Sequence, residues 1–307
     1  FFFKQKTAYE ITYGDWSSDV CSSDLPAWGA FVPAAARAAE RLGARPLGLD
    51  LAVTSTVPTG GGLSSSAALA VALVLAHCTA GGVEPDPHDL AYAAQAVEVD
   101  ATGVPCGSMD QLASALGVAD HALRVDCRSG AVTAVPLPSD LAVVVVHSGI
   151  ERTLAGSEYA QRRAACEATA ARLGLASLRD ATPEQVADEP FARHVVGEIA
   201  RVDRFVDALT RGDHDALGAI LGEGHASLRD DFAVSLTEID RLVELLVAHG
   251  ALGARITGAG FGGCVVALVP TERAEHTATG AAADYAAATG RTPRAFTVRA
   301  ADGARVL

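Results

Sequence analysis

A glycine-rich segment followed by serines, Pro58 to Ala68 (PTGGGLSSSAA), has the residue types needed to hold a phosphate group. Its three consecutive glycines let the backbone approach a bulky anion, because no Cβ atom stands in the way. The serines follow where a helix is expected to begin, and free N–H groups and the positive end of the helix dipole attract anions there. Serine hydroxyls add donors to phosphate oxygens or ligands for Mg²⁺. The residues of this predicted phosphate loop are Gly60, Gly61, Gly62, Leu63, Ser64, Ser65 and Ser66.

The phosphate loop differs from the Walker form, because it lacks the G-K-[ST] ending. A glycine-rich turn with a serine helix cap is the alternative interpretation, and three glycines alone would favour it. The proline, leucine, three serines and two alanines around them favour the phosphate loop instead.

Two carboxylates, Glu98 and Asp110, are candidates for the chemistry that follows nucleotide binding. Glu98 lies on a predicted helix, and Asp110 follows twelve residues later in the segment GVPCGSMDQ. Phosphoryl transfer to an alcohol requires a metal ligand and a group that orients or deprotonates the hydroxyl, and two carboxylates can divide these tasks. An aspartate in such a segment, taken alone, is more often a helix cap.

The hydrophobic periodicity predicts the elements that must position these residues. Apolar spacing indicates helices over residues 27–42, 64–77, 90–100, 159–173, 195–210 and 236–249. Alternating or continuously apolar runs indicate strands over 47–56, 123–126 and 141–147, the last buried on both faces, and loop and strand over 254–269. Because these elements do not alternate as strict βαβ units, we expect α+β lobes.

The phosphate loop resembles the second signature of the GHMP kinases, P-x-x-x-G-L-x-S-S-A. This family includes galactokinase, homoserine kinase, mevalonate kinase and phosphomevalonate kinase. The resemblance implies ATP as the phosphoryl donor, with the loop around the triphosphate and Ser66 as a ligand of Mg²⁺. It also implies a two-lobed α+β GHMP-kinase fold with the active site in the cleft between the lobes.

Two further segments resemble the galactokinases within this family. The residues around Asp110 are similar to their string P-C-G-x-M-D-Q, in which the aspartate is the catalytic residue beside the sugar C1 hydroxyl. The family's Mg²⁺-binding glutamate stands twelve residues upstream, at the position of Glu98. Residues 156–167 resemble S-E-Y-x-x-R-R-x-x-C-E, whose tyrosine hydrogen-bonds the sugar. The resemblance therefore implies galactose contacts at Tyr159, Asp110 and Gly107.

The segment TGAGFGGC near the C-terminus resembles the third GHMP signature. A Gly-x-Gly-x-x-Gly pattern alone is weak evidence, but here it comes third in the order that the family shows. Its glycines allow a tight loop to approach the phosphate loop, and its threonine is placed to hydrogen-bond near the reacting phosphate. The candidate residues of this third-motif loop are Thr257, Gly258, Gly260, Gly262 and Gly263.

Other matches to galactokinase strings involve residues that we expect to be structural. Asp126 and Arg128, in the segment LRVDCR, are interpreted as an ion pair. His194 and His225 have chemically versatile side chains, but we predict a structural role for both.

Charge and composition narrow the range of partners. A formal charge of -13 argues against nucleic-acid binding, and no apolar run reaches the roughly 18 residues of a transmembrane helix. The six cysteines are scattered without a C-x-x-C pair, which argues against a zinc site and a disulfide framework. Isolated thiols fit a reducing compartment. These observations predict a cytoplasmic protein with neither nucleic acid nor membrane as a partner, and the resemblance implies an enzyme that binds galactose and ATP.

The first 25 residues differ abruptly from the rest of the chain. They contain both of its lysines and three of its nine phenylalanines. They resemble translated sequencing-adapter read-through and lack the continuous apolar stretch of a signal peptide. We expect residues 1–25 to be a non-native or artefactual leader that makes little contact with the folded body.

The remaining chain is divided into an N-terminal ATP-binding lobe, 26–137, and a C-terminal lobe, 138–307. The galactokinase resemblance covers both, but the family's first motif, an R-x-N-x-I-G-E-H-T-D-like stretch that holds the sugar, does not occur in the sequence. We therefore expect the N-terminal lobe to be incomplete and catalysis by the chain as printed to be impaired. The alternatives are a GHMP kinase for another sugar or a small alcohol, and a non-catalytic galactokinase-like sensor of sugar and ATP. The joint presence of Ser66, Glu98 and Asp110 favours the enzyme.

Overall fold

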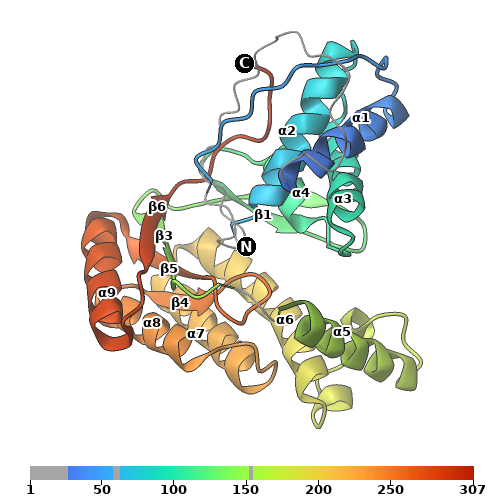
Figure 1. Cartoon of the computed structure of the whole chain (residues 1–307). Coiled ribbons are helices and arrows are strands. Elements are labelled where there is room, and N and C mark those ends of the chain that lie inside the picture. The colour runs from blue at the N-terminus through green and yellow to red at the C-terminus, as the bar shows by residue number, and fades with distance from the viewer. Residues whose placement is uncertain (1–26, 58–62, 152–154) are drawn as a thin grey trace. The chain divides into compact units, whose positions relative to one another are not determined.

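The computed structural model describes residues 27–57, 63–151 and 155–307, which form two compact units (Figure 1). The first unit runs through Ala134 and takes in Arg299–Leu307, and the second contains Val135–Val298. In the structure the last nine residues belong to the first unit, whereas the division made from the sequence places them in the C-terminal lobe. The predicted leader and the glycines of the phosphate loop lie outside the described residues. Among the helices that the structure describes, none combines the length and apolar character required to cross a bilayer.

Four helices make up most of the first unit. They are α1 (Phe31–Arg41), preceded by a 3₁₀ turn at Ala27–Ala30, α2 (Ser65–Ala80), α3 (Pro87–Thr102) and α4 (Met109–Leu116). Helix α2 is apolar around most of its circumference because α1, α3 and α4 all pack against it. Its alanines and valines allow close helix contacts, and Ala70, Val71 and Val74 are fully buried in the shared core.

A short hairpin completes the first unit. Strand β1 (His121–Val125) pairs with β2 (Val132–Pro136), and the boundary between the two units falls inside β2. The carboxylate of Asp126 accepts hydrogen bonds from the backbone N–H groups of Arg128 and Ser129, at 2.9 and 3.2 Å, and so stabilises the turn between the strands. This contact gives Asp126 a structural role, and its predicted ion pair with Arg128 stays a prediction.

The predicted strand over residues 47–56 is wrong. The segment has no strand conformation and no strand partner in the part of the chain that the structure describes. Leu47 is 47% exposed and Val53 is 36% exposed, whereas Leu51 is partly buried against the core of the first unit, so the apolar side of the alternation is only partly covered. Alternation predicts which side chains would share a face, but a strand forms only when another strand accepts its backbone hydrogen bonds.

The second unit is built around a four-stranded antiparallel sheet with the order β4-β5-β3-β6. Its strands are β3 (Leu141–His147), β4 (Gly253–Ile256), β5 (Cys264–Pro270) and β6 (Arg294–Val298). In the central pairing of β3 with β5, Leu141 lies opposite Pro270 and His147 opposite Cys264. The predicted burial of the valine run on both faces is confirmed, because its four valines are at most 4% exposed.

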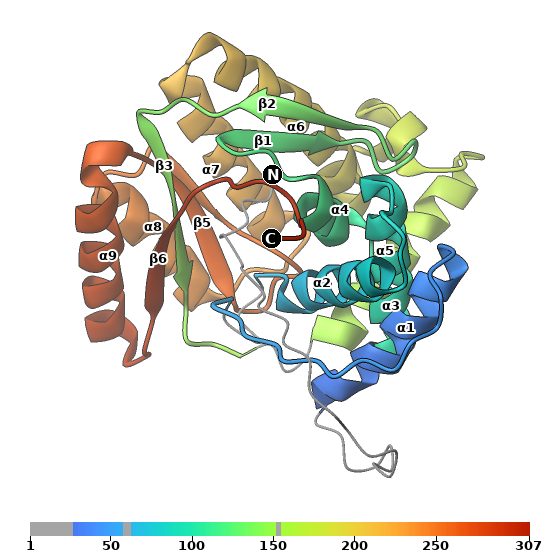
Figure 2. The same cartoon turned by 90° about the horizontal axis from the view of Figure 1, so that it is seen from above.

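Helices cover this sheet and extend beyond it (Figures 1 and 2). Helix α8 (Thr237–Ala248) packs on β4 and β5, and α9 (Ala274–Thr289) packs on β3, β5 and β6. Helix α7 (His214–Asp230) contacts β4 and also packs against α6 (Pro190–Arg211), which in turn contacts α5 (Ala155–Arg172). Short 3₁₀ turns lie at Leu178–Asp180, Glu184–Val186 and Thr271–Arg273.

Candidate active site

Three helices of the first unit bring together Ser66, Glu98 and Gln111. The Ser66 hydroxyl donates a hydrogen bond to Oε1 of Glu98 at 2.6 Å. The Gln111 side-chain amide donates to the other carboxylate oxygen, Oε2, at 2.5 Å. Both oxygens of Glu98 are therefore held, one by a hydroxyl and one by an amide, and hydrogen bonds to an ionised acceptor are among the stronger ones in proteins.

The local sequence explains why each of these residues lies where it does. Helix α2 begins at Ser65, directly after Ser64, whose backbone has the left-handed φ of 57°. Ser66 therefore lies in the first turn of the helix, as predicted, where backbone N–H groups have no partner within the helix. Helix α3 ends at Gly103 with φ 69°, so Glu98 lies in the second turn from its C-terminal end.

Asp110 lies in the first turn of α4, next to Gln111, and is half-buried. The connection that precedes it carries Cys106, whose carbonyl accepts a hydrogen bond of 2.8 Å from the Gln95 side chain. The pKa of the Cys106 thiol is raised, mainly by burial and further by the negative charges of Glu98 and Asp110. Both candidate carboxylates are thus within electrostatic reach of one thiol, which stays neutral near pH 7 and is a poor nucleophile.

Gln111 is a site residue to which the sequence analysis gave no role. It is 1% exposed, and its Oε1 has no hydrogen-bond partner among the described residues. A carboxylate only accepts hydrogen bonds, so the amide nitrogen of Gln111 must face Glu98. The available signal was a polar amide at a core position of a short helix, directly after the candidate base.

The oxygen donors of Ser66 and Glu98 fit Mg²⁺. This ion prefers hard oxygen ligands and usually combines one or two carboxylates with water and substrate phosphate oxygens. Within the described ranges no three His, Cys, Asp or Glu side chains cluster as metal ligands. A hydroxyl and a carboxylate oxygen 2.6 Å apart therefore suit an ion whose remaining ligands come from a nucleotide and water. They do not suit a metal that is held by protein groups alone.

The third-motif loop joins β4 to β5 in the second unit and has the tight conformation that its glycines predict. Gly260 has φ 83°, and a Cβ atom added to it would lie 2.5 Å from Cβ of Val234. A Cβ atom on Gly262, at φ 118°, would lie 2.9 Å from Ile150. Side chains are excluded at both positions, so the loop keeps one conformation against its neighbours.

Backbone hydrogen bonds tie this loop to the second unit. Phe261 N–H donates to the Val234 carbonyl at 2.8 Å, and Gly263 N–H donates to the Ile150 carbonyl at 3.1 Å. At its base, Thr257 N–H donates to the Cys264 carbonyl at 3.0 Å. Thr257 thus lies at the point where β4 ends and the loop begins.

Not every predicted contact residue has a described side chain. Tyr159 lies on helix α5, and its side chain is outside the part of the structure that is described. Gly107 lies in the exposed connection before α4. The roles predicted for Tyr159 and Gly107 in sugar binding stay predictions.

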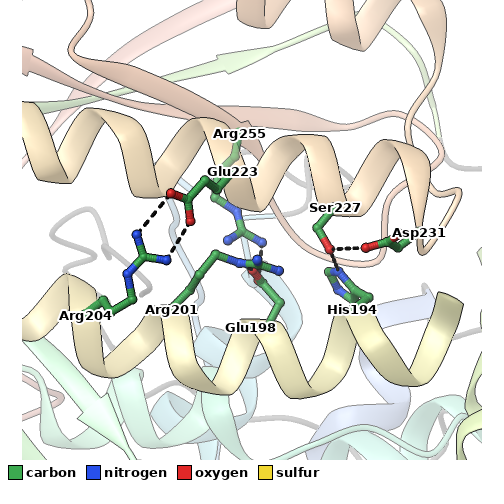
Figure 3. A network of polar contacts seen from close by, with 8 residues as sticks. All are labelled: His194, Glu198, Arg201, Arg204, Glu223, Ser227, Asp231 and Arg255. Carbon is green, nitrogen blue, oxygen red and sulfur yellow. Dashed lines mark hydrogen bonds and ion pairs between the residues drawn. The ribbon is translucent and has the colours of Figure 1, made fainter. Parts of the chain in front are cut away.

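Two buried histidines, His194 and His225, belong to polar networks within the second unit. The Ser227 hydroxyl donates to Asp231 at 3.0 Å, so the Nδ1–H of His194, 2.9 Å away, must donate to Ser227 (Figure 3). Burial lowers the pKa of His194 to about 4, and nearby Glu198 only partly opposes this effect. His225 contacts Asp240 at 3.0 Å, and burial lowers its pKa as well. These contacts support structural roles for both histidines.

Comparison with known proteins relates most of the chain to one group of kinases. The family model "GHMP kinases N terminal domain" matches residues 30–118, and "GHMP kinases C terminal" matches residues 205–287. A galactokinase from Roseiflexus sp. (strain RS-1) is 43% identical over 303 residues, covering 94% of this chain and 78% of the relative. A galactokinase from Chloroflexus aggregans is 44% identical over 260 residues, covering 80% of this chain and 67% of the relative. Among solved structures, Lactococcus lactis galactokinase complexed with galactose superposes with a TM-score of 0.85 at 27% identity, covering 95% of this chain and 80% of that one.

Proposed function

Since this chain belongs to the galactokinase family of the GHMP kinases, we propose that it transfers the γ-phosphoryl group of ATP to the C1 hydroxyl of galactose. The product is galactose 1-phosphate. The observation that carries the proposal is the group formed by Ser66, Glu98 and Gln111, with Asp110 on the same helix as Gln111. Ser66 would contact the phosphate and the metal, and Glu98 would be the metal ligand. Gln111 orients Glu98, and Asp110 is the candidate base.

The residues divide the work of phosphoryl transfer. The backbone N–H groups of the phosphate loop and the first turn of α2 would bind the triphosphate. Ser66 and Glu98 would hold Mg²⁺, which when bound neutralises charge on the triphosphate oxygens. Asp110 would accept the proton of the sugar C1 hydroxyl while the oxygen of that hydroxyl attacks the γ-phosphorus and ADP leaves. Thr257, at the start of the third-motif loop, is the proposed hydrogen-bonding group for the reacting phosphate.

Galactose is favoured over other acceptors by the galactokinase relatives and by the galactose that the superposed Lactococcus lactis structure contains. Tyr159, Gly107 and Asp110 are the proposed sugar contacts. A GHMP kinase for another small alcohol is the remaining enzymatic alternative. The five cysteines that the structure describes carry free thiols, which supports the assignment to the cytoplasm.

The test is an assay of ADP release with galactose, glucose and homoserine offered separately. Phosphorus NMR of the reaction mixture identifies the phosphorylated position. The expected result is turnover with galactose and formation of a sugar 1-phosphate. A clear preference for homoserine would contradict the sugar-kinase assignment, and nucleotide binding without turnover of any acceptor would favour the sensor.

A further inference from the structure

Arg162, on helix α5, is a cation placed almost entirely out of solvent. Its side chain is 11% exposed. Its Nε donates to the Phe232 carbonyl at 2.7 Å, and its Nη2 donates to the Ala233 carbonyl at 2.7 Å. Its Nη1 donates to the Glu158 carbonyl at 3.0 Å. Burial of a guanidinium is costly unless its donors are used, and here all three nitrogens are used.

The same guanidinium lies over an aromatic ring of the third-motif loop. Its Cζ is 4.9 Å from the ring centroid of Phe261, and it is 5.5 Å from the ring centroid of Phe191 on α6. Phe261 has a φ of 57°, which is unusual for a bulky residue. A cation over its ring is an attraction that helps to offset this backbone strain.

The carbonyls that Arg162 binds belong to a turn that also touches the loop. After α7 ends, Ala233 takes a φ of 52°, and the next residue, Val234, is 1% exposed. The Val234 carbonyl accepts the hydrogen bond from Phe261 N–H, and Val234 is the residue that excludes a side chain at Gly260. Arg162 therefore contacts the loop directly through Phe261 and indirectly through the turn.

From these contacts we infer that Arg162 is a positioning residue, which fixes the third-motif loop relative to helix α5. Tyr159, the proposed sugar contact, lies three residues earlier on that helix, so Arg162 links the segments proposed to contact the sugar and the phosphate. This inference rests on the proposed function for its catalytic consequence, but the structural link does not depend on it. Without Arg162, a loop with four glycines has many accessible backbone conformations, and a small displacement near the reacting groups slows catalysis.

The neighbouring arginine provides a matched control. Arg163 has the same charge as Arg162 and lies on the same helix. Its side chain, however, is 62% exposed and pairs with Glu167, one turn along α5, at 2.8 Å. Exposed pairs of this kind contribute little to stability. Arg162→Gln and Arg163→Gln remove the same group at adjacent positions, so any difference between them reports the buried contacts.

The experiment measures hydrogen exchange in the full chain for the parent, Arg162→Gln, Arg162→Lys and Arg163→Gln. In Arg162→Gln we expect amides of residues 258–263 to exchange about tenfold faster, because a lost cation–π and carbonyl contact is of that order. Peptides from α9 should be unchanged. Arg162→Lys keeps the charge near the ring but not the three-way fork, so its loop exchange should be intermediate. Exchange at 258–263 equal to that of Arg163→Gln, or raised equally throughout the chain, would overturn the inference.

A second variant and a kinetic measurement complete the test. If Arg162→Gln does not fold, Phe261→Leu removes the ring while leaving the carbonyl contacts, and it should also speed exchange of the loop. With galactose and ATP, Arg162→Gln should lower kcat by about 10- to 100-fold with a smaller change in KM, and Arg162→Lys should restore part of it. Unchanged kcat together with faster loop exchange overturns the catalytic part of the inference. A parent chain that phosphorylates no sugar would count against the proposed function alone, because the exchange result still decides the role of Arg162.

Discussion

The hydroxyl of Ser66 lies 2.6 Å from Oε1 of Glu98, although 32 residues separate them in the sequence. The contact joins the first turn of α2 to the last part of α3, and Gln111 from α4 holds the opposite oxygen of the same carboxylate. Ser66 and Glu98 are the two residues that would hold the proposed metal ion, and they already lie within hydrogen-bond distance of each other. The pair is therefore already arranged for the task that we propose.

Ser66→Ala is expected to weaken binding of Mg·ATP by about tenfold or more, because it removes a ligand from the proposed ion. Binding of ATP measured in the presence of EDTA should change less, since the backbone N–H groups of the helix remain. Isothermal titration calorimetry with and without Mg²⁺ separates the two effects. A well-folded parent chain that binds no ATP would refute the assignment of the phosphate loop.

Gln111→Leu should destabilise the chain by about 1–3 kcal/mol, since a partly buried carboxylate loses a donor. It should also raise the Mg²⁺ concentration needed for half-maximal ATP binding, because Glu98 loses the contact that orients it. The matched control is Gln185→Leu, at an exposed glutamine whose side chain bonds only to the nearby Thr182 backbone in the described contacts. Urea unfolding of both variants checks the first claim, and equal midpoints would contradict it.

Asp110→Asn should reduce the turnover of galactose by about 10²- to 10⁴-fold, as expected for loss of a general base. His194→Ala should retain most of the activity, because His194 is buried among structural partners. Both variants are compared with the parent chain in the same assay of ADP release with galactose. Equal turnover in Asp110→Asn and its parent would remove the assigned base.

The stability of the second unit should fall in acid, and His194 should account for part of the loss. Its pKa in the folded state is about 4, below the ordinary value of 6.5, so the unfolded chain binds the proton more readily. The contribution of neutral His194 to the free energy of unfolding is complete above pH 6.5. It falls by up to about 3 kcal/mol as the pH decreases toward 4. Urea unfolding between pH 7 and pH 4.5 should show a smaller decline for His194→Gln than for the parent. The same decline in both would show that His194 is not responsible.

Gly260→Ala should destabilise the chain more than Gly290→Ala. Both glycines have positive φ, 83° and 68°, so both substitutions carry the cost of a left-handed backbone, about 1 kcal/mol. A Cβ atom at Gly260 would in addition lie 2.5 Å from Cβ of Val234, whereas nothing lies within 4 Å of one at Gly290. We expect an extra loss of about 1–3 kcal/mol at Gly260, measured by thermal or urea unfolding. Equal losses would mean that the loop moves freely away from Val234.

The sequence by itself determined the features that are encoded locally. The glycine-serine run predicted where α2 begins, because a helix N-terminus has its own residue preferences. The valine run predicted β3 to the residue, since a short, almost continuously apolar and β-branched run is typical of a strand buried on both faces. Helices α7 and α9 and the short helix α4 were not predicted. Alanine occupies many positions of α9, exposed and buried alike, so its pattern gives little contrast between faces.

Only the tertiary structure decided which distant residues meet. The alternation over residues 47–56 favoured a strand, but no partner strand lies beside it in the described part of the chain, and a single segment cannot satisfy its own ladder hydrogen bonds. For Gln111 and Arg162, no local signal in the sequence says which partner gives each residue its role. Gln111 obtains its role from Glu98 on another helix, and Arg162 obtains its role from carbonyls 70 and 71 residues away. Contacts of this range depend on how helices pack, and the periodicity of one helix says which face is buried but not which group it will meet there.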